Sequence, residues 1–163
     1  MADAVTRAKR NFLGLSVSTL DPQRRMLFPK TWRLPTDNDE TAFYVMPFWN
    51  NTLKVVTPED FDEINRTLSN MDLSDEENLD AITQVGSLSQ MIIPDKQGRF
   101  SISKEIQEYA HLDKKAVLVG AIAFGRIISE ELWEKCGRNP ANLVKLEKEI
   151  FTAKQRTQNN STN

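Results

Sequence analysis

The sequence has one cysteine, Cys136, and one histidine, His111, among its 163 residues. A single cysteine excludes a disulfide within the chain, and together with a single histidine it excludes an ordinary zinc site built from several Cys and His ligands. These two residues also give no nucleophile and base at a recognisable spacing, which leaves only dispersed carboxylates as candidates for catalysis. We therefore expect neither an enzyme nor a bound metal or cofactor.

The chain also lacks long apolar runs and a strong net charge. No segment approaches the roughly 18 apolar residues that a membrane span requires, and the first ten residues have no apolar core of signal-peptide length. We expect a cytoplasmic protein with no membrane partner and no evident small-molecule substrate. The formal charge of -2 and the pI near 5.5 do not indicate nucleic-acid binding, so DNA binding would require basic residues gathered on one surface.

What the sequence does contain is a repeat. The segment Asp95–Ile106 matches the segment Asp21–Trp32, because each has an Asp, an Arg four residues later, apolar residues at alternate positions and then a lysine. A turn, a short strand and a helix start account for this pattern. Two copies in one small chain predict an internal pseudo-dimer, since a solenoid needs at least three repeats.

The match between the copies extends beyond this segment. The offset falls from 74 residues at Asp21 and Asp95 to 72 residues at Thr57 and Ser129, so the first copy has two extra residues. We place both in a loop within residues 35–51, because loops accept insertions at low cost. The other matched segments are residues 43–46 with 117–120, and residues 53–61 with 125–133.

These offsets predict a first domain at residues 11–70, a second at residues 82–137, and a C-terminal helix with a polar tail at residues 138–163. The link between the two domains is acidic and is predicted to be helical in parts. Thr57-Pro58 and the segment from Ser74 to Glu77 are typical helix starts. Asn139-Pro140 begins the last helix, in which apolar residues recur at helical spacing.

Two Asp-x-x-x-Arg motifs, each leading into a short strand and then Pro29-Lys30 or Ser103-Lys104, resemble the MraZ family of bacterial transcriptional regulators. The resemblance covers about residues 11–137 and implies two SpoVT/AbrB-like DNA-binding domains. The implied fold is mainly β with short helices (α+β), a pseudo-dimeric swapped double-split β-barrel of two β-α-β repeats, as in AbrB and MazE. The implied partner is double-stranded promoter DNA, bound as repeated boxes upstream of a cell-division and cell-wall operon by a homo-oligomeric ring.

The resemblance transfers the DNA-contacting arginine of the motif to Arg25 and Arg99, with Asp21 and Asp95 as the residues that stabilise the turns. An arginine fork can bind the guanine O6 and N7 atoms or a phosphate, and an aspartate can hold a turn by accepting backbone N–H groups. For a single motif, a surface ion pair that only tightens a hairpin would be the better explanation. The duplication within the family pattern favours DNA binding for both arginines.

Four other basic residues are candidates for DNA contact. Arg24 lies on the first turn, at a position where the family usually has Gly, so it is open whether the two turns share one geometry. Lys30, Arg33 and Lys104 lie near the helix starts after the turns, where phosphate contact is plausible, although solvated surface side chains are an equal alternative. The basic segment at residues 7–10 is better explained as a mobile arm than as a DNA contact.

The aromatic residues suggest packing rather than base stacking. Trp32 matches Ile106, and Phe61 matches Trp133, so we predict that these positions belong to the core. Trp49 has no counterpart and is predicted to be exposed at a subunit contact.

The favoured function is a sequence-specific DNA-binding regulator at the nucleoid. The alternative is an antitoxin-like or scaffold protein that binds another protein through Trp49 or the final helix.

Overall fold

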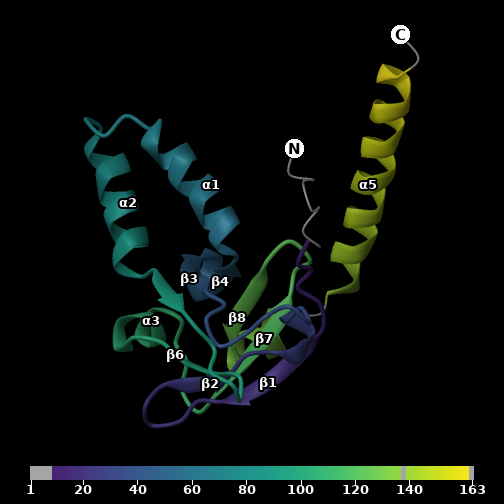
Figure 1. Cartoon of the computed structure of the whole chain (residues 1–163). Coiled ribbons are helices and arrows are strands. Elements are labelled where there is room, and N and C mark those ends of the chain that lie inside the picture. Colours follow the sequence, from purple (N-terminus) through teal and green to yellow (C-terminus); the bar gives the residue numbers. More distant parts are fainter. Residues whose placement is uncertain (1–8, 137–138, 162–163) are drawn as a thin grey trace, which may run out of the picture. The chain divides into compact units, whose positions relative to one another are not determined.

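The computed structural model describes residues 9–136 and 139–161 (Figure 1). The chain divides into two compact units, residues 1–130 and residues 131–163. The first unit holds all eight strands found in the described residues, and the second holds most of α4 (Glu130–Cys136) and all of α5 (Pro140–Asn160). Within the described ranges, no helix combines the length and the apolar character that crossing a membrane demands.

The two Asp-x-x-x-Arg motifs lead into a short two-stranded ribbon. Strand β2 (Arg25–Leu27) pairs antiparallel with β6 (Arg99–Ser101), and Met26 lies directly opposite Phe100. These two central side chains are buried while their neighbours on each strand are exposed. This is the period-2 alternation that the sequence predicted, and it fixes which face of the ribbon meets solvent.

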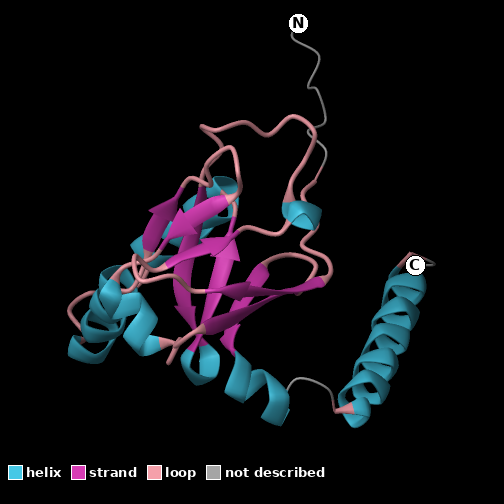
Figure 2. Cartoon of the chain, turned by 90° about the horizontal axis from the view of Figure 1, so that it is seen from below, coloured by secondary structure: helices cyan, strands magenta, loops and turns pink. Residues whose placement is uncertain are grey.

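The other six strands form one antiparallel sheet (Figure 2). The sheet order is β1 (Leu15–Thr19), β7 (Lys115–Gly120), β8 (Gly125–Ser129), β4 (Thr52–Val56), β3 (Phe43–Phe48) and β5 (Gln90–Ile92). The first strand of each repeat pairs inside the opposite repeat: β1 with β7, and β5 with β3. The strands are therefore exchanged between the repeats, and β4 pairs with β8 at the centre.

The α+β class is confirmed by this mixture of antiparallel strands and helices. No closed barrel is detected among the described strands, which form one six-stranded sheet and one separate ribbon. The elements follow nearly the same order in both repeats, with a 3-10 turn, η1 (Lys30–Trp32), where the second repeat has α3 (Lys104–Tyr109). The helix predicted after Pro29 is thus a single turn.

The strand pairing corrects one detail of the repeat alignment. Val45 pairs with Val55 in the first repeat, and Leu118 pairs with Ile127 in the second, and all four side chains belong to the same buried core. Val45 is therefore equivalent to Leu118, an offset of 73, whereas the sequence match was displaced by one residue in this strand. A one-residue slip would turn every side chain of the strand to the opposite face. One extra residue thus precedes β3, and the other lies in the turn between β3 and β4.

The core is built on edge-to-face aromatic contacts. The ring of Trp32 lies 5.3 Å from that of Phe12 and 5.4 Å from that of Phe28, and all three side chains are buried. Ile106 is buried at the position equivalent to Trp32, as the repeat predicted. Such pairs add about 0.5–1.5 kcal/mol each beyond the burial of apolar area.

Three other aromatic residues lie outside the core. Phe61 is half-buried in α1 and stacks on Tyr44 of β3, with ring centroids 3.9 Å apart. Trp133 is half-buried on α4, in the second unit. The core prediction was therefore wrong for Phe61 and Trp133, because repeat matching finds equivalent positions without finding their burial. Trp49 is 78% exposed in the 3-10 turn η2 (Trp49–Asn51).

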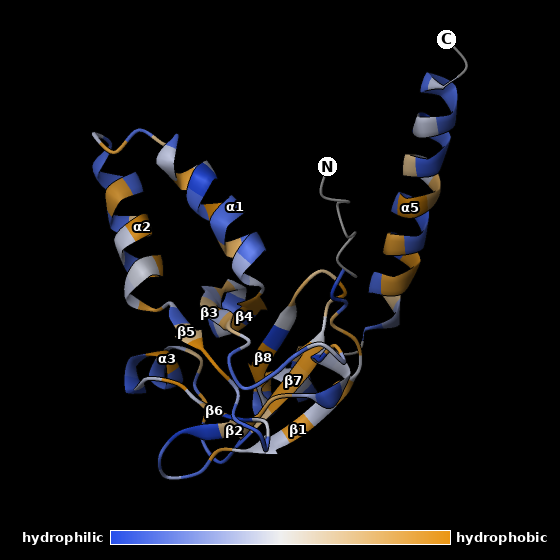
Figure 3. Ribbon diagram, viewed as in Figure 1, coloured by the Kyte–Doolittle hydropathy of each residue, from blue (hydrophilic) through white to orange (hydrophobic). Residues whose placement is uncertain are grey.

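The acidic link forms two helices, α1 (Pro58–Ser69) and α2 (Glu76–Ser87); α1 is mostly hydrophilic, whereas α2 mixes hydrophilic and hydrophobic residues (Figure 3). Thr57 caps α1 by accepting from the backbone N–H of Asp60, as predicted. Asp75, rather than Ser74, caps α2, so the capping-box assignment was displaced by one residue. In the second unit, Asn139 caps α5, whose apolar stripe is exposed; its residues are Leu143, Leu146 and Ile150.

Candidate nucleic-acid interface

The first motif folds into a turn centred on one carboxylate. Asp21 Oδ1 accepts from the backbone N–H groups of Gln23 and Arg25, at 2.9 Å each, and Oδ2 accepts from Arg25 Nε at 2.7 Å. An aspartate suits this place because its short side chain reaches the backbone two residues on and mimics a backbone turn. The carboxylate therefore holds both the turn and the arginine side chain that follows it.

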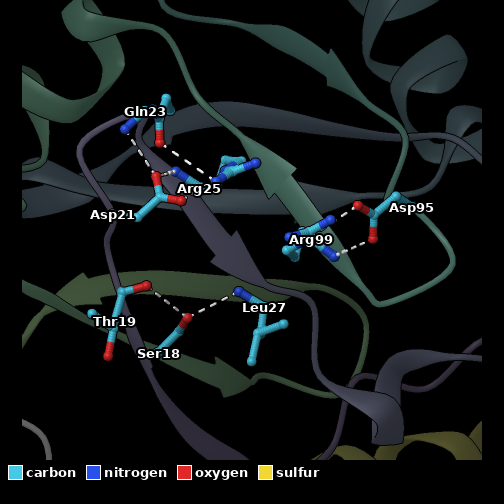
Figure 4. A network of polar contacts seen from close by, with 8 residues as sticks. All are labelled: Ser18, Thr19, Asp21, Gln23, Arg25, Leu27, Asp95 and Arg99. Atoms are coloured by element: carbon cyan, nitrogen blue, oxygen red, sulfur yellow. Dashed lines mark hydrogen bonds and ion pairs between the residues drawn. The ribbon is translucent and has the colours of Figure 1, made fainter.

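The second motif repeats this arrangement (Figure 4). Asp95 Oδ1 accepts from the backbone N–H groups of Gln97 and Arg99 at 2.9 Å each, and Oδ2 accepts from Arg99 Nε at 3.1 Å. In both turns the Nε of the arginine donates to the aspartate, so the aspartate does not use the two terminal nitrogens. The two terminal nitrogens of each guanidinium are then held at a fixed orientation on the exposed face of the ribbon.

Both carboxyl groups have a lowered pKa. The backbone N–H of the motif arginine is the largest cause in each case, and the guanidinium of that same arginine lowers the pKa further. A hydrogen bond donated to the charged form favours ionisation. Both aspartates are consequently ionised at neutral pH, and the turns do not depend on pH in the physiological range.

We expect the carboxyl groups of Asp21 and Asp95 to titrate below the ordinary value of about 3.9. A carboxyl whose pKa is lower in the folded than in the unfolded chain stabilises the fold above the unfolded pKa, and this contribution is lost as the pH falls through the folded pKa. Carboxyl carbon shifts followed by NMR as the pH is lowered from 6 would report it, with the denatured chain as control. Midpoints at or above the denatured value would contradict the turn geometry.

Arg24 and Gly98 occupy equivalent positions, and both have positive φ, 59° and 84°. The carbonyl oxygen of Arg24 accepts from Ile102 N at 3.2 Å, and that of Gly98 accepts from Phe28 N at 2.7 Å. The two turns therefore share one geometry although one of them lacks glycine. The Nε of Arg24 also donates to the Ile102 carbonyl at 3.0 Å, which offsets part of the strain of a left-handed non-glycine residue.

The two motif arginines lie on one ribbon face. Arg25 and Leu27 on β2 lie opposite Ser101 and Arg99 on β6, so the arginines sit at diagonal corners. Their side chains are 42% and 44% exposed. The ribbon thus brings two basic side chains to one exposed surface, each paired with its own aspartate.

The two candidate lysines are exposed, and each follows one of the ribbon strands in the sequence. Lys30 begins η1, and Lys104 begins α3, where its Nζ lies 3.8 Å from a carboxylate oxygen of Glu108. Both can reach a polyanion without losing a buried contact. Their assignment as phosphate contacts remains a prediction.

Arg33 has a different setting, because it reaches from the first repeat to the turn of the second. Its Nη2 lies 3.5 Å from the Asp95 carbonyl oxygen, and its guanidinium lies over the ring of Phe28. The equivalent residue, Gln107, instead donates to the Leu112 carbonyl within its own repeat. Arg33 therefore stabilises the turn of the second repeat, whereas Gln107 does not make the equivalent contact with the first turn. Matching the two repeats in sequence did not predict this difference.

The basic residues near the start of the chain divide into separate cases. Arg7 lies outside the described residues, and Lys9 is exposed. Arg10 pairs with Asp37 through both terminal nitrogens, at 2.6 and 2.7 Å, and donates to the Trp32 carbonyl at 2.7 Å. Arg10 is thus engaged in the fold, and its hydrogen bond lowers the pKa of Asp37.

Among the described residues, no group of three or more potential ligands could hold a metal ion.

Comparison with known proteins gives a consistent result. No family model matches the chain. Proteins named transcriptional regulator MraZ are similar to it: one from Mycobacterium leprae is 27% identical over 122 residues, covering 75% of this chain and 83% of the relative. Those from Mycoplasma mobile and Methylococcus capsulatus are 26% and 28% identical, covering 85% and 77% of this chain and 94% and 83% of the relatives. Over three quarters or more of its length, the chain is thus similar to transcriptional regulators of the MraZ family. This confirms the resemblance based on the two motifs.

MraZ proteins are transcriptional regulators and form a non-enzymatic family, in agreement with the expectation from the sequence. Sequence reasoning passed over Gln23 and Gln97, whose backbone N–H groups complete the two Asp-x-x-x-Arg turns. The available signal was their repetition, since each stands two residues after the motif aspartate.

Proposed function

We propose that the chain is a sequence-specific DNA-binding transcriptional regulator that reads double-stranded promoter DNA with its two Asp-x-x-x-Arg turns. The observation that carries the proposal is the placing of Arg25 and Arg99 on one exposed ribbon face, each held through Nε by its aspartate. Terminal guanidinium nitrogens held in this way can bind a guanine edge or a phosphate without losing further side-chain entropy. Lys30, Lys104 and Arg24 would add contacts to the DNA backbone.

The finer parts of the proposal follow the family. Strand exchange between the repeats is compatible with a swapped double-split barrel. An oligomeric ring would present many ribbons to repeated promoter boxes upstream of the protein's own cell-division and cell-wall operon, so that modest contacts per chain add up to useful affinity. Such a regulator would act at the nucleoid in the cytoplasm.

We expect binding to a duplex from the region upstream of the protein's own gene to fall by about tenfold or more when salt is raised from 50 to 200 mM. The reason is counterion release, because each phosphate neutralised by a basic side chain contributes to the slope of log K against log salt. Fluorescence anisotropy of a labelled duplex measures the slope directly. A scrambled duplex of equal length is the control for sequence specificity.

The alternative function, an antitoxin-like or scaffold protein, predicts a different result. The exposed Trp49 and the apolar stripe of α5 are the features that favour a protein partner. Apolar association responds little to salt in this range. A chain that retains no duplex at 50 mM salt would remove the DNA-binding proposal and leave this alternative.

A further inference from the structure

Each DNA-facing turn carries a glutamine that the function described so far does not use. Gln23 and Gln97 stand at equivalent positions, two residues after Asp21 and Asp95 and two before Arg25 and Arg99. Both side chains are exposed. The exposed residue before each glutamine is not repeated, since Pro22 in the first turn corresponds to Lys96 in the second.

The backbone of both glutamines is fixed. The N–H of Gln23 donates to Asp21 Oδ1 and the N–H of Gln97 donates to Asp95 Oδ1, each at 2.9 Å. The same carboxylates also hold the arginines that follow. The backbone of each glutamine is therefore positioned relative to its arginine by one shared carboxylate, which sets the point from which the amide reaches out.

The side-chain end of the glutamine lies beside the guanidinium in the first turn. Arg25 Nη2 is 3.4 Å from Gln23 Oε1, a long hydrogen bond that leaves both groups able to bind other partners. In the described part of the chain, no hydrogen bond is found from the Gln97 side-chain amide. Both amides consequently have donors and acceptors available to a ligand at the ribbon face.

The chemistry of the amide selects one ligand. An amide offers a donor and an acceptor side by side, which matches the N7 acceptor and N6 donor of adenine in the major groove. The terminal nitrogens of arginine match the two acceptors of guanine. A solvated glutamine would not need to recur at the equivalent position of both turns.

We propose that Gln23 and Gln97 are specificity-determining residues, each contacting an adenine edge next to a guanine contacted by Arg25 or Arg99. This inference rests on the proposed DNA-binding function and adds a base preference to it. A carboxylate in place of the amide can only accept, and it pairs with the N4 amino group of cytosine. Exchange of the amide for a carboxylate should therefore change the preferred base rather than only weaken binding.

The test is selection from a duplex library with a randomised central segment, followed by sequencing, for the full chain. Wild type is expected to enrich an adenine beside a guanine. In Gln23→Glu and Gln97→Glu, the relative enrichment at that adenine should move toward cytosine by about tenfold, while the neighbouring guanine is kept. Gln84→Glu, the same change on α2, should leave the wild-type preference unaltered.

Three outcomes would overturn the inference. Base preferences identical to wild type in both glutamate variants would place the amides away from the bases. A uniform loss of affinity across all sequences, in these variants and in Gln23→Ala and Gln97→Ala, would assign them to phosphates. A wild-type selection that yields a defined site without adenine beside guanine would refute the base assignment alone. A wild-type selection that enriches no sequence would defeat the proposed function itself.

Discussion

The double variant Arg25→Ala/Arg99→Ala is expected to bind upstream duplex DNA at least about a hundredfold more weakly than wild type. A well-placed guanidinium contact to a base contributes about 1–3 kcal/mol, and tenfold in Kd corresponds to about 1.4 kcal/mol. Each single variant should lose about tenfold. Because both side chains are exposed and their partners are the local aspartates, the melting temperature should change little. Electrophoretic shift or anisotropy, with a thermal melt alongside, measures both.

Matched variants separate position from charge. Arg66→Ala removes the same charge from α1 and should leave binding nearly unchanged, since Arg66 does not lie on the ribbon. Arg25→Lys and Arg99→Lys keep the charge but lose the planar fork, so they should retain binding to scrambled DNA while losing preference for the upstream duplex. Wild-type affinity in the double alanine variant would exclude the ribbon from DNA binding.

Gly120→Ala is expected to lower the free energy of unfolding by about 3 kcal/mol and the melting temperature by roughly 10 °C. A Cβ at Gly120 would overlap the carbonyl group of Phe12 and lie 2.6 Å from Leu13 Cα. These are backbone atoms, which cannot rotate away as a side-chain tip can. The N–H of Gly120 also donates to the Gly14 carbonyl at 2.9 Å, so separation of the two segments would break this bond as well.

Gly86→Ala is the matched control for this prediction. A Cβ at Gly86 would meet no atom within 4 Å, and the residue lies near the end of α2. Alanine should therefore stabilise the chain, by up to about 1 kcal/mol, because it has the higher helix propensity. Urea unfolding of both variants gives the difference. Equal stability of Gly120→Ala and wild type would mean that the approach of Phe12 to β7 is looser than described.

The sequence predicted those features that depend on local pattern. Alternation around Met26 and Phe100 predicted the ribbon strands and their buried faces, and Thr57-Pro58 predicted the start of α1. Duplication predicted two turns with the same roles for aspartate and arginine. Local patterns succeed here because a cap or an alternating strand is determined by neighbouring residues.

Features that depend on distant partners were not predictable from pattern. The alternation around Val17 does not reveal that β1 pairs with β7, since a strand sequence does not specify its partner. The one-residue displacement at Phe43 became visible only when Val45 and Leu118 were found in one core. Arg33 illustrates the same limit at the site, because its contact with the second turn joins residues 62 positions apart.

The exchange of β1 and β5 between the repeats has a consequence for synthesis on the ribosome. The first repeat emerges with β1 lacking its partner, and that partner is completed only when residue 120 has left the exit tunnel. Until then the nascent chain exposes an unpaired strand edge, which invites association with other chains. A stalled nascent chain ending before β7 should accordingly be sensitive to protease and recruit chaperones, whereas release of the last strands would convert both halves to the native state in one cooperative step.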